Sequence, residues 1–243
     1  MRRRCNVVPA GWHLTKTRAM NSLDRPVWAS LTHAPHLGEG GDLAKRFRRD
    51  VNVFASAYDD SPSSLAALRD LVPQGESIYV LQVPEIRVPN GLLVARTAQG
   101  LQLLATRPIA AQAGDDTIVE LGDADAPQMV ALAKLTEPGP FLARTHTMGR
   151  FIGIRVDGRL AAMAGERMRF PGFTEVSGVC THPDFRGRGY ARRLSSIVAN
   201  AIQQRCEQPF LHSWTSNDAA IALYESLGFE RRATVQVAVL KRQ

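Results

Sequence analysis

The residues best suited to chemistry lie in one short stretch, THPDFRGRGYARRL at 181–194. Two glycines, Gly187 and Gly189, stand there between an apolar strand-like run and a helical pattern. Glycine has no side chain, so a bulky group can approach the backbone closely. The first N–H groups of a helix lack intrahelical acceptors and carry the positive end of its dipole. The step is therefore either a phosphate site or an ordinary strand-to-helix turn.

Two familiar phosphate loops do not fit this stretch. A Walker A loop needs a Lys-Ser or Lys-Thr pair after its glycines, and none follows here. A dinucleotide fingerprint needs a small residue at the sixth position, but counting from Gly187 that position is Arg192.

A third pattern fits. Residues 186–191, Arg-Gly-Arg-Gly-Tyr-Ala, match the Q/R-x-x-G-x-G/A signature. They follow a strand that ends with Val179, Thr181 and Pro183 in a V-x-T-x-P arrangement. Downstream come Asn217 and then ALYESLGF at 222–229. Together these segments resemble the GNAT N-acetyltransferase superfamily, and the resemblance covers about residues 117–243.

The resemblance implies acetyl-CoA as co-substrate. The pyrophosphate is expected on the backbone N–H groups of 186–191, and the pantetheine arm along the strand edge at Val179 and Thr181. Asn217 is expected to bond the pantetheine, although it could serve only as a helix cap. The cofactor-binding residues implied are thus Val179, Thr181, Arg186, Gly187, Arg188, Gly189, Tyr190, Ala191 and Asn217.

Acetyl transfer to an amine also needs proton chemistry, because an alkylammonium cannot attack a thioester. The resemblance implies Tyr224 as the acid that protonates the departing thiolate, since a phenol can donate at neutral pH. Glu175, eleven positions before Arg186, is the expected base, and Glu166 is the alternative; either could act through a water. The alternatives are a packing role for the tyrosine and solvent exposure for the glutamates.

The second half of the chain contains the elements that must position these groups. We expect strands at 117–121, 175–182, 209–214 and 233–240, and a hairpin at 151–170 turning on Asp157-Gly158. Helices are expected after Asp123 or Asp125, at 141–149, after Gly189 and at 217–228. This order indicates a mixed α/β sheet with helices on its faces, the GNAT-like domain at 117–243.

The first half carries no matching signature. Residues 1–25 read as a loose arm, and residues 26–116 as an additional N-terminal αβ region of unknown role. A helix is expected at 63–72 and strands at 77–83, 91–98 and 101–107, the last two joined by a tight turn at Gln99-Gly100. The cluster RPIAAQAGDD at 107–116 suggests the boundary.

Charge and composition limit the other classes. The net charge of +7 is spread over both halves, with 14 basic and 11 acidic residues in 1–116 and 16 and 12 in 117–243. Nucleic-acid binding ranks low, because basic and aromatic residues do not interleave in a recognisable motif. His33-x-x-His36 lacks a third ligand, so no metal is expected. No apolar run is long enough for a membrane span, and the start lacks the apolar core of a signal peptide, which favours the cytoplasm.

The sequence therefore predicts an acetyl-CoA-dependent N-acetyltransferase that transfers the acetyl group by direct attack of an amine in a ternary complex. The acceptor is a small molecule or a protein amine, and a homodimer is compatible with the sequence. The alternative is a CoA-binding regulatory module without turnover.

Overall fold

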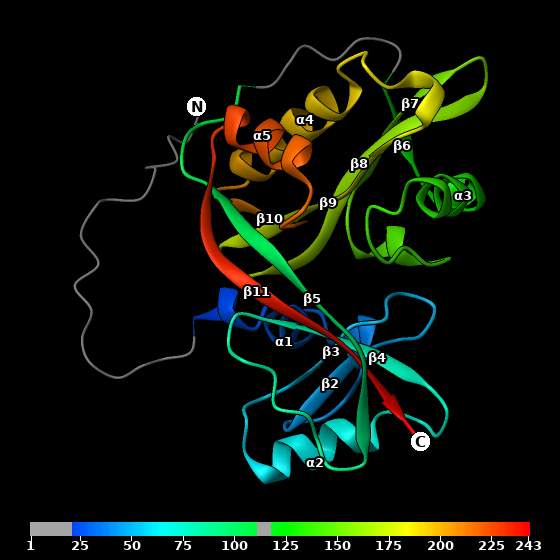
Figure 1. Ribbon diagram of the computed structural model, residues 1–243. Helices are drawn as coiled ribbons and strands as arrows, with labels where there is room; N and C mark the ends of the chain where they lie inside the picture. Colours follow the sequence, from blue (N-terminus) through cyan, green and yellow to red (C-terminus); the bar gives the residue numbers. More distant parts are fainter. Residues whose placement is uncertain (1–20, 111–117) are drawn as a thin grey trace.

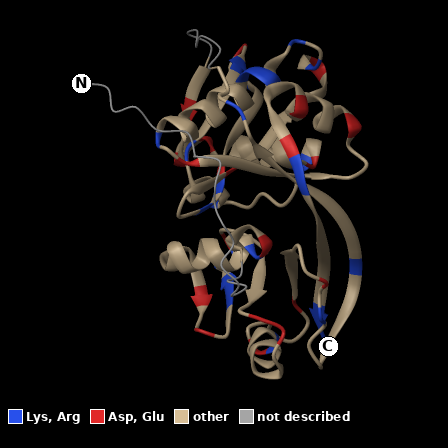
Figure 2. Ribbon diagram, turned by 90° about the vertical axis from the view of Figure 1, so that its left-hand side faces the viewer, with Lys and Arg blue, Asp and Glu red and all other residues tan. Residues whose placement is uncertain are grey.

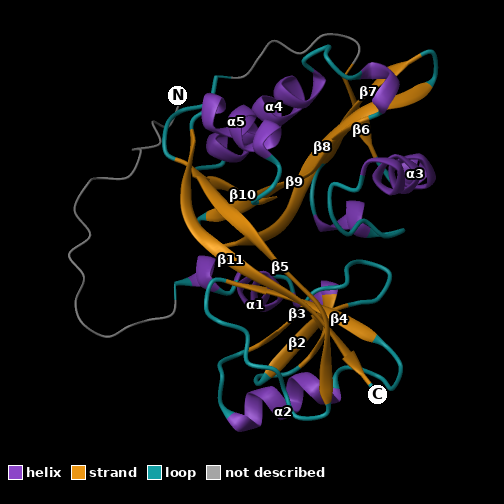
Figure 3. Cartoon of the chain, in the orientation of Figure 1, coloured by secondary structure: helices purple, strands orange, loops and turns teal. Residues whose placement is uncertain are grey.

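The structure is a computed structural model that describes residues 21–110 and 118–243. Its centre is a mixed eight-stranded sheet in the order β4-β11-β5-β10-β9-β8-β7-β6, and a smaller sheet has the order β1-β2-β3. Figure 1 shows the two long strands β5 and β11 running from the part that carries α3, α4 and α5 to the part that carries α1, α2 and the small sheet. Figure 3 separates these helices and strands by colour.

The elements have the following bounds. The strands are β1 Gly38–Gly40, β2 Ala44–Phe47, β3 Ala55–Ala57, β4 Ser77–Gln82, β5 Leu92–Ala105, β6 Ile118–Leu121, β7 Phe151–Val156, β8 Arg159–Phe170, β9 Phe173–Thr181, β10 Gln208–Trp214 and β11 Phe229–Arg242. The α-helices are α1 Pro26–His33, α2 Pro62–Asp70, α3 Ala126–Thr136, α4 Tyr190–Gln204 and α5 Asp218–Leu227.

Alternation along the strands assigns each helix to one face of the main sheet. Ile152 and Ile154 of β7 pack with the apolar face of α4, whereas the preceding residue, Phe151, packs with residues of α3 in another cluster. In β10, Leu211 joins the α4 cluster and Phe210 joins the α1 cluster. Because successive strand residues point to opposite faces, α4 and α5 cover one face and α1 and α3 the other.

The sequence predictions for the second half are largely confirmed. The hairpin turns on Asp157 and Gly158, whose φ angles of 49° and 75° fit a type I′ turn. Helix α5 begins after Asn217, whose side chain accepts from the Ala220 N–H, and ends at Gly228 with a φ of 105°. The prediction of a helix at 141–149 was too long, since only Thr145–Met148 form a single 3-10 turn.

The turn expected at Gln99-Gly100 is wrong. Residues 92–105 form one continuous strand, β5, between β11 and β10. A Cβ on Gly100 would lie 3.0 Å from the Ser213 carbonyl oxygen and 3.1 Å from a Val235 methyl group. The glycine is therefore explained by close approach to the two neighbouring strands, not by a turn.

The first half of the chain builds part of the same sheet. Strands β4 and β5 come from the N-terminal region 26–116, yet both pair with β11. Residues 21–25 of the expected loose arm are packed: Leu23 is buried in the α1 cluster, and the buried Arg25 pairs with Asp60 at 2.6 Å. Residues 1–20 and most of the expected boundary, 111–117, lie outside the described residues.

The sheet splays between β9 and β10. These parallel strands pair only from Phe173 to Glu175 of β9, against Gln208 to Phe210 of β10. Beyond that point β10 pairs with β5, and β9 continues to Thr181 beside β8. The splay leaves backbone groups of both strands without a sheet partner on that side, and opens a space in the middle of the sheet.

Three further observations concern the described residues. None of their helices is long and apolar enough to cross a bilayer. Within the same residues, no three His, Cys, Asp or Glu side chains come together as a metal site. Basic and acidic segments are interspersed over the side of the molecule seen in Figure 2.

Close packing at the strand pair β7–β8 gives a first testable prediction. A Cβ on Gly165 would lie 2.3 Å from the buried Phe151 ring, whereas a Cβ on Gly122 would meet nothing within 4 Å. We expect Gly165→Ala to lower the free energy of unfolding by about 1–3 kcal/mol because the core is overpacked. Urea unfolding should show Gly122→Ala close to the unsubstituted protein; equal stability of the two variants would contradict this packing.

Candidate active site

A cavity of about 130 Å³ occupies the splay between β9 and β10. Its walls combine the C-terminal halves of these strands with α5, β11 and the loop after α3. The residues that matter for chemistry are Arg167, the backbone of 176–179, His212, Asn217, Tyr224 and Glu137. Polar groups from several elements of the second half of the chain thus meet at one place in the sheet.

The glycine step lies at the start of helix α4. Gly187 and Gly189 have φ angles of 78° and 75°, and a Cβ on either would meet nothing within 4 Å. The first helical hydrogen bond runs from the Arg193 N–H to the Gly189 carbonyl at 3.0 Å. The preceding N–H groups therefore point away from the helix interior, as an anion-binding N-terminus requires.

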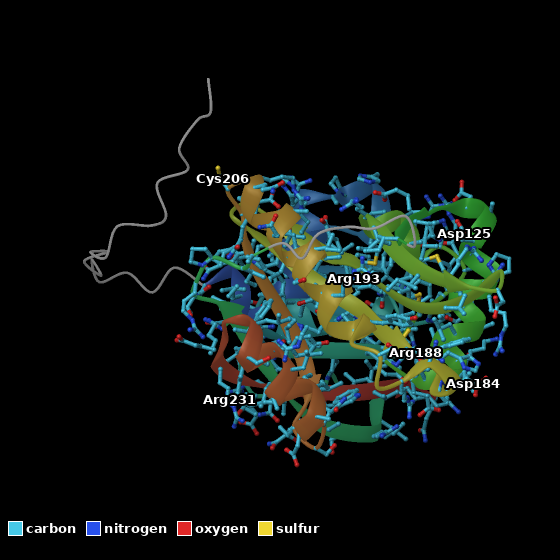
Figure 4. The ribbon with its side chains drawn as sticks, turned by 90° about the horizontal axis from the view of Figure 1, so that it is seen from above. Asp125, Asp184, Arg188, Arg193, Cys206 and Arg231 are labelled. Carbon is cyan, nitrogen blue, oxygen red and sulfur yellow. The ribbon has the colours of Figure 1, made fainter. Side chains whose placement is uncertain are left out.

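Basic side chains surround this step. Arg188 and Arg159 both lie over the Phe185 ring, with guanidinium carbons 5.3 Å and 5.4 Å from its centroid. Figure 4 shows Arg188 beside the turn that enters α4, close to Asp184. Arg192, in the first turn of the helix, donates to the Ser226 hydroxyl at 2.7 Å. The field at the N-terminus of α4 is thus reinforced by two side chains stacked on one aromatic ring.

The expected acid lies in the cavity wall. Tyr224 is buried on α5, and its ring packs edge-on against Phe229. Burial raises the pKa of the phenol above its usual value, and the neighbouring Cys180 acts in the same direction. The hydroxyl is therefore protonated at neutral pH. Burial likewise raises the pKa of the Cys180 thiol to about 11, which leaves it without nucleophilic character.

Strand β9 carries a bulge at the cavity. Gly178 and Val179 stand opposite the single residue Ala164 of β8, and Gly178 has a φ of 64°. A bulge interrupts the ladder and re-aims backbone groups. Two residues on, the Thr181 hydroxyl is buried and has no hydrogen-bond partner among the described residues. This edge therefore offers unused polar groups beside the cavity.

Glu175 is buried beneath the cavity. Arg167 donates to both of its oxygens, from Nε at 2.8 Å and from Nη2 at 2.7 Å, and the His212 Nδ1 lies 2.7 Å from Oε1. Burial alone would raise the pKa of this carboxyl. The charge and hydrogen bonds of Arg167 and the hydrogen bond to His212 outweigh burial, and they lower the pKa to about 2. Glu175 is thus an ionised anchor whose own oxygens do not line the cavity.

The neighbours of His212 fix its tautomer. The Gln102 side-chain oxygen accepts from Arg232 at 2.8 Å, and its nitrogen donates to the Leu23 carbonyl at 2.9 Å. That same nitrogen lies 3.1 Å from the His212 Nε2 and therefore donates to it. The tautomer that satisfies both neighbours therefore carries its proton on Nδ1, directed at Glu175, and accepts at Nε2.

The alternative base, Glu166, lies elsewhere. Both of its oxygens accept from Arg205, at 2.9 Å and 3.0 Å, and the carboxylate does not line the splay cavity. Among the residues predicted from the sequence, the cavity brings together Val179, Asn217 and Tyr224. Thr181 and residues 186–191 lie further along β9 and at the start of α4.

Sequence reasoning missed Arg167, His212 and Glu137. The signal for His212 was present in PFLHSW, where a titratable residue interrupts an apolar strand. Arg167 could not be found, because a bulge places Arg167 and Met168 opposite the single residue Glu175. Glu137 follows α3 in a left-handed conformation, which the local sequence Glu-Pro-Gly-Pro does not predict.

A second cavity of about 490 Å³ adjoins the first. The two share a wall made of Tyr79, Glu137, Gly139, Pro140, Trp214 and Val237. Its floor is apolar and lies over β4, β11 and the first half of β5. The N-terminal region therefore helps to build the site through Val53 and Tyr79.

Comparisons with known proteins agree with this architecture. Residues 151–238 match the model of the FR47-like protein family. A GNAT-family protein from Novosphingobium aromaticivorans, known from a crystal structure, is 42% identical to this chain in sequence. The match covers 92% of this chain and 99% of that protein's chain, and the two structures superpose with a TM-score of 0.85. A GCN5-related N-acetyltransferase from Kribbella flavida, 18% identical, shares the fold over 91% of this chain and 96% of its own, with a TM-score of 0.62.

Two curated relatives are similar over parts of their length. The N-alpha-acetyltransferase RimI of Mycobacterium tuberculosis is 39% identical over 37% of this chain and 56% of its own. The mycothiol acetyltransferase of Kocuria rhizophila is 29% identical over 75% of this chain and 63% of its own. The chain thus spans about three fifths of the length of these two relatives.

The fold, the glycine step at α4 and the splayed sheet define the class of acetyltransferases. The chain belongs to the GNAT family of acetyltransferases, as its similarity to the Novosphingobium structure shows over nearly its whole length.

The Glu175 site gives a prediction of pH-dependent stability. A carboxyl whose folded-state pKa is lowered stabilises the fold above its unfolded-state pKa of 4.5, and this contribution decreases as the pH falls toward 2. At neutral pH, Glu175→Gln leaves Arg167 unpaired, and we expect a loss of about 3–5 kcal/mol. In urea unfolding, the difference from the unsubstituted protein should shrink below pH 4.5.

The control is Glu120→Gln, which removes an exposed ion pair with Arg150. This variant should differ by less than about 1 kcal/mol at neutral pH. A Glu175→Gln variant as stable as this control would contradict the role of Glu175 as a buried anchor.

Proposed function

We propose that this protein is an acetyl-CoA-dependent N-acetyltransferase in which an amine attacks the thioester directly within a ternary complex. The observation that carries the proposal is the cavity in the splay, where Val179, Asn217 and Tyr224 meet beyond the glycine step of α4. This arrangement offers an open strand edge and a proton donor in the cavity, and an anion site further along the chain at the start of α4.

The residues along this path fit acetyl-CoA. The pyrophosphate is assigned to the N–H groups of 187–191, because the two left-handed glycines leave that backbone open, whereas the Arg186 N–H donates to the Pro183 carbonyl at 3.3 Å. Arg186 and Arg188 supply positive charge there, and Tyr190 and Ala191 are the first two residues of the helix. The pantetheine arm is assigned to the edge of Val179 and Thr181, with Asn217 across the cavity; the Thr181 hydroxyl then gains the partner it lacks.

We assign the removal of the proton from the amine to the His212–Glu175 pair. Glu175 has both oxygens bonded, so a proton can reach it only through His212, which lines the cavity. His212 Nε2 accepts the proton from the amine while Nδ1 keeps its hydrogen bond to Glu175, which stabilises the imidazolium. The bond from Gln102 to Nε2, at 3.1 Å the longest on this ring, is the one that the incoming amine replaces.

Tyr224 protonates the departing thiolate. A thiolate leaving into a buried cavity needs a proton donor, and a phenol kept neutral by burial is available there. We assign the stabilisation of the negative charge that develops on the thioester oxygen to a backbone N–H near Val179. There the bulge of β9 interrupts the hydrogen-bond ladder.

Calorimetric titration with acetyl-CoA tests the cofactor site. We expect Gly187→Ala and Gly189→Ala to weaken binding about tenfold, because each methyl group enters the space that a phosphate needs. The matched control is Gly172→Ala in the β8–β9 turn, which has a φ of 83° and equally open surroundings. It carries the same backbone strain but should leave affinity unchanged; no measurable binding by the unsubstituted protein would overturn the proposal.

Release of free thiol in the presence of amines tests the catalytic groups. We expect His212→Gln to lower kcat by about 100-fold or more, because the glutamine amide cannot accept the proton of the amine. Tyr224→Phe should lower kcat while leaving acetyl-CoA affinity nearly intact. His33→Gln, on the exposed surface of α1, is the control. Binding of acetyl-CoA without thiol release for any amine would favour a regulatory module instead.

A further inference from the structure

The larger cavity is the part of the site to which no role has yet been assigned. Its volume of about 490 Å³ falls in the range that small-molecule sites occupy. None of the residues assigned to acetyl-CoA lines it, whereas Glu137 and Trp214 lie in the wall that it shares with the splay cavity. It is therefore the space from which an acceptor can reach the thioester.

The lining of this cavity has a definite chemistry. Its floor is apolar and aromatic, with Tyr79, Phe141 and Val237 among its residues. Three charged side chains stand at its edge, namely Arg96, Lys134 and Glu137. Within the part of the chain that the structure describes, no ion pair or side-chain hydrogen bond joins any of the three to another group. A ligand that satisfies all of them carries both signs of charge on an apolar body.

The backbone conformation and the position of Glu137 are both unfavourable for a glutamate. It caps the C-terminal end of α3 in the left-handed region, with φ and ψ of 50°, where glycine or asparagine is usual. Its carboxylate also lies at the negative end of the helix dipole, where a cation would be favoured. A residue that breaks two local rules without a structural partner indicates a functional constraint.

The positions of the three charges give the ligand a direction. Glu137 lines both cavities, so a group bound to it lies at their junction, toward His212 and Tyr224. Arg96 and Lys134 line only the larger cavity, so a group bound to them lies further from the reaction centre. An acceptor oriented this way presents its ammonium to the thioester and its anionic group to the far wall.

We propose that the larger cavity binds the acceptor, and that the acceptor is a small amine with an apolar portion and an anionic group such as a carboxylate. Glu137 binds the ammonium, Arg96 and Lys134 bind the anionic group, and the aromatic floor holds the apolar portion. This inference rests on the proposed acetyltransferase function and names the substrate class of that same site.

A panel of matched acceptors tests the substrate class. Thiol release is measured with L-phenylalanine and L-leucine, with their amides, with the amines that lack the carboxyl group, and with peptides that begin with the same residues. We expect kcat/KM for the free amino acids to exceed that for the amides and amines by about tenfold or more, because each of these lacks the charge for Arg96 and Lys134. Equal or better turnover of amides, amines or peptides would overturn the proposal, and so would the absence of turnover with every member of the panel.

Variants of Glu137 separate binding from stability. Glu137→Gly removes both the strained conformation and the misplaced charge, so the melting temperature should rise by about 2–4 °C. The KM for the amino-acid acceptor should rise about tenfold or more in the same variant, while the Kd for acetyl-CoA stays unchanged. Glu85→Gln, an exposed carboxylate that lines neither cavity, is the control and should change none of the three values.

Arg96→Gln completes the test. It should raise the KM for L-phenylalanine and leave the KM for phenylalanine amide unchanged, because only the first has the carboxylate. Equal effects on both acceptors would contradict the assignment of the far wall. Failure of the proposed function itself has a different signature, because acetyl-CoA would then either not bind in calorimetry or bind without thiol release for amines of every class.

Discussion

The centre of the sheet depends on the buried ion pair between Glu175 and Arg167. Glu175 is the last residue of β9 that pairs with β10, and beyond it the two strands separate. Its carboxylate joins β9 to Arg167 of β8 and to His212 of β10. Three strands are thus tied together at the apex of the splay. The space above can stay open because the charge beneath it is fully bonded.

The N-terminal region belongs to this arrangement and is not an accessory to it. Strand β5 supplies Gln102 beneath His212 and Gly100 beside Ser213, so it supports β10 from the side that β9 has left. Strand β4 and the segment before it place Val53 and Tyr79 in the wall of the larger cavity. The family motif lies only in the second half of the chain. The larger cavity, which we propose binds the acceptor, is lined by residues of both halves.

The sequence allowed the local structure around the proposed cofactor site to be predicted far better than the larger cavity. Gly187, Gly189, Asn217 and Tyr224 act through local structure, such as a helix start or a cap, and local structure is encoded by nearby residues. Arg167 and His212 become neighbours only through strand register and a bulge, which a single sequence does not specify. Gly100 misled the strand prediction for the same reason, because its close contacts come from β10 and β11.

The long pairing of β5 with β11 has a consequence for how the molecule folds. Ala105 pairs with Phe229 and Leu92 with Arg242, so the ribbon joins two segments that are separated in the sequence by all the elements from β6 to α5. Pairing of segments so distant in sequence carries a large cost in loop-closure entropy, and this cost arises before the contacts between the strands stabilise the pair. Strand β11 also carries Val237, which lines both cavities. We therefore expect the larger cavity to be among the last features to form, after the local structure of the α4 glycine step.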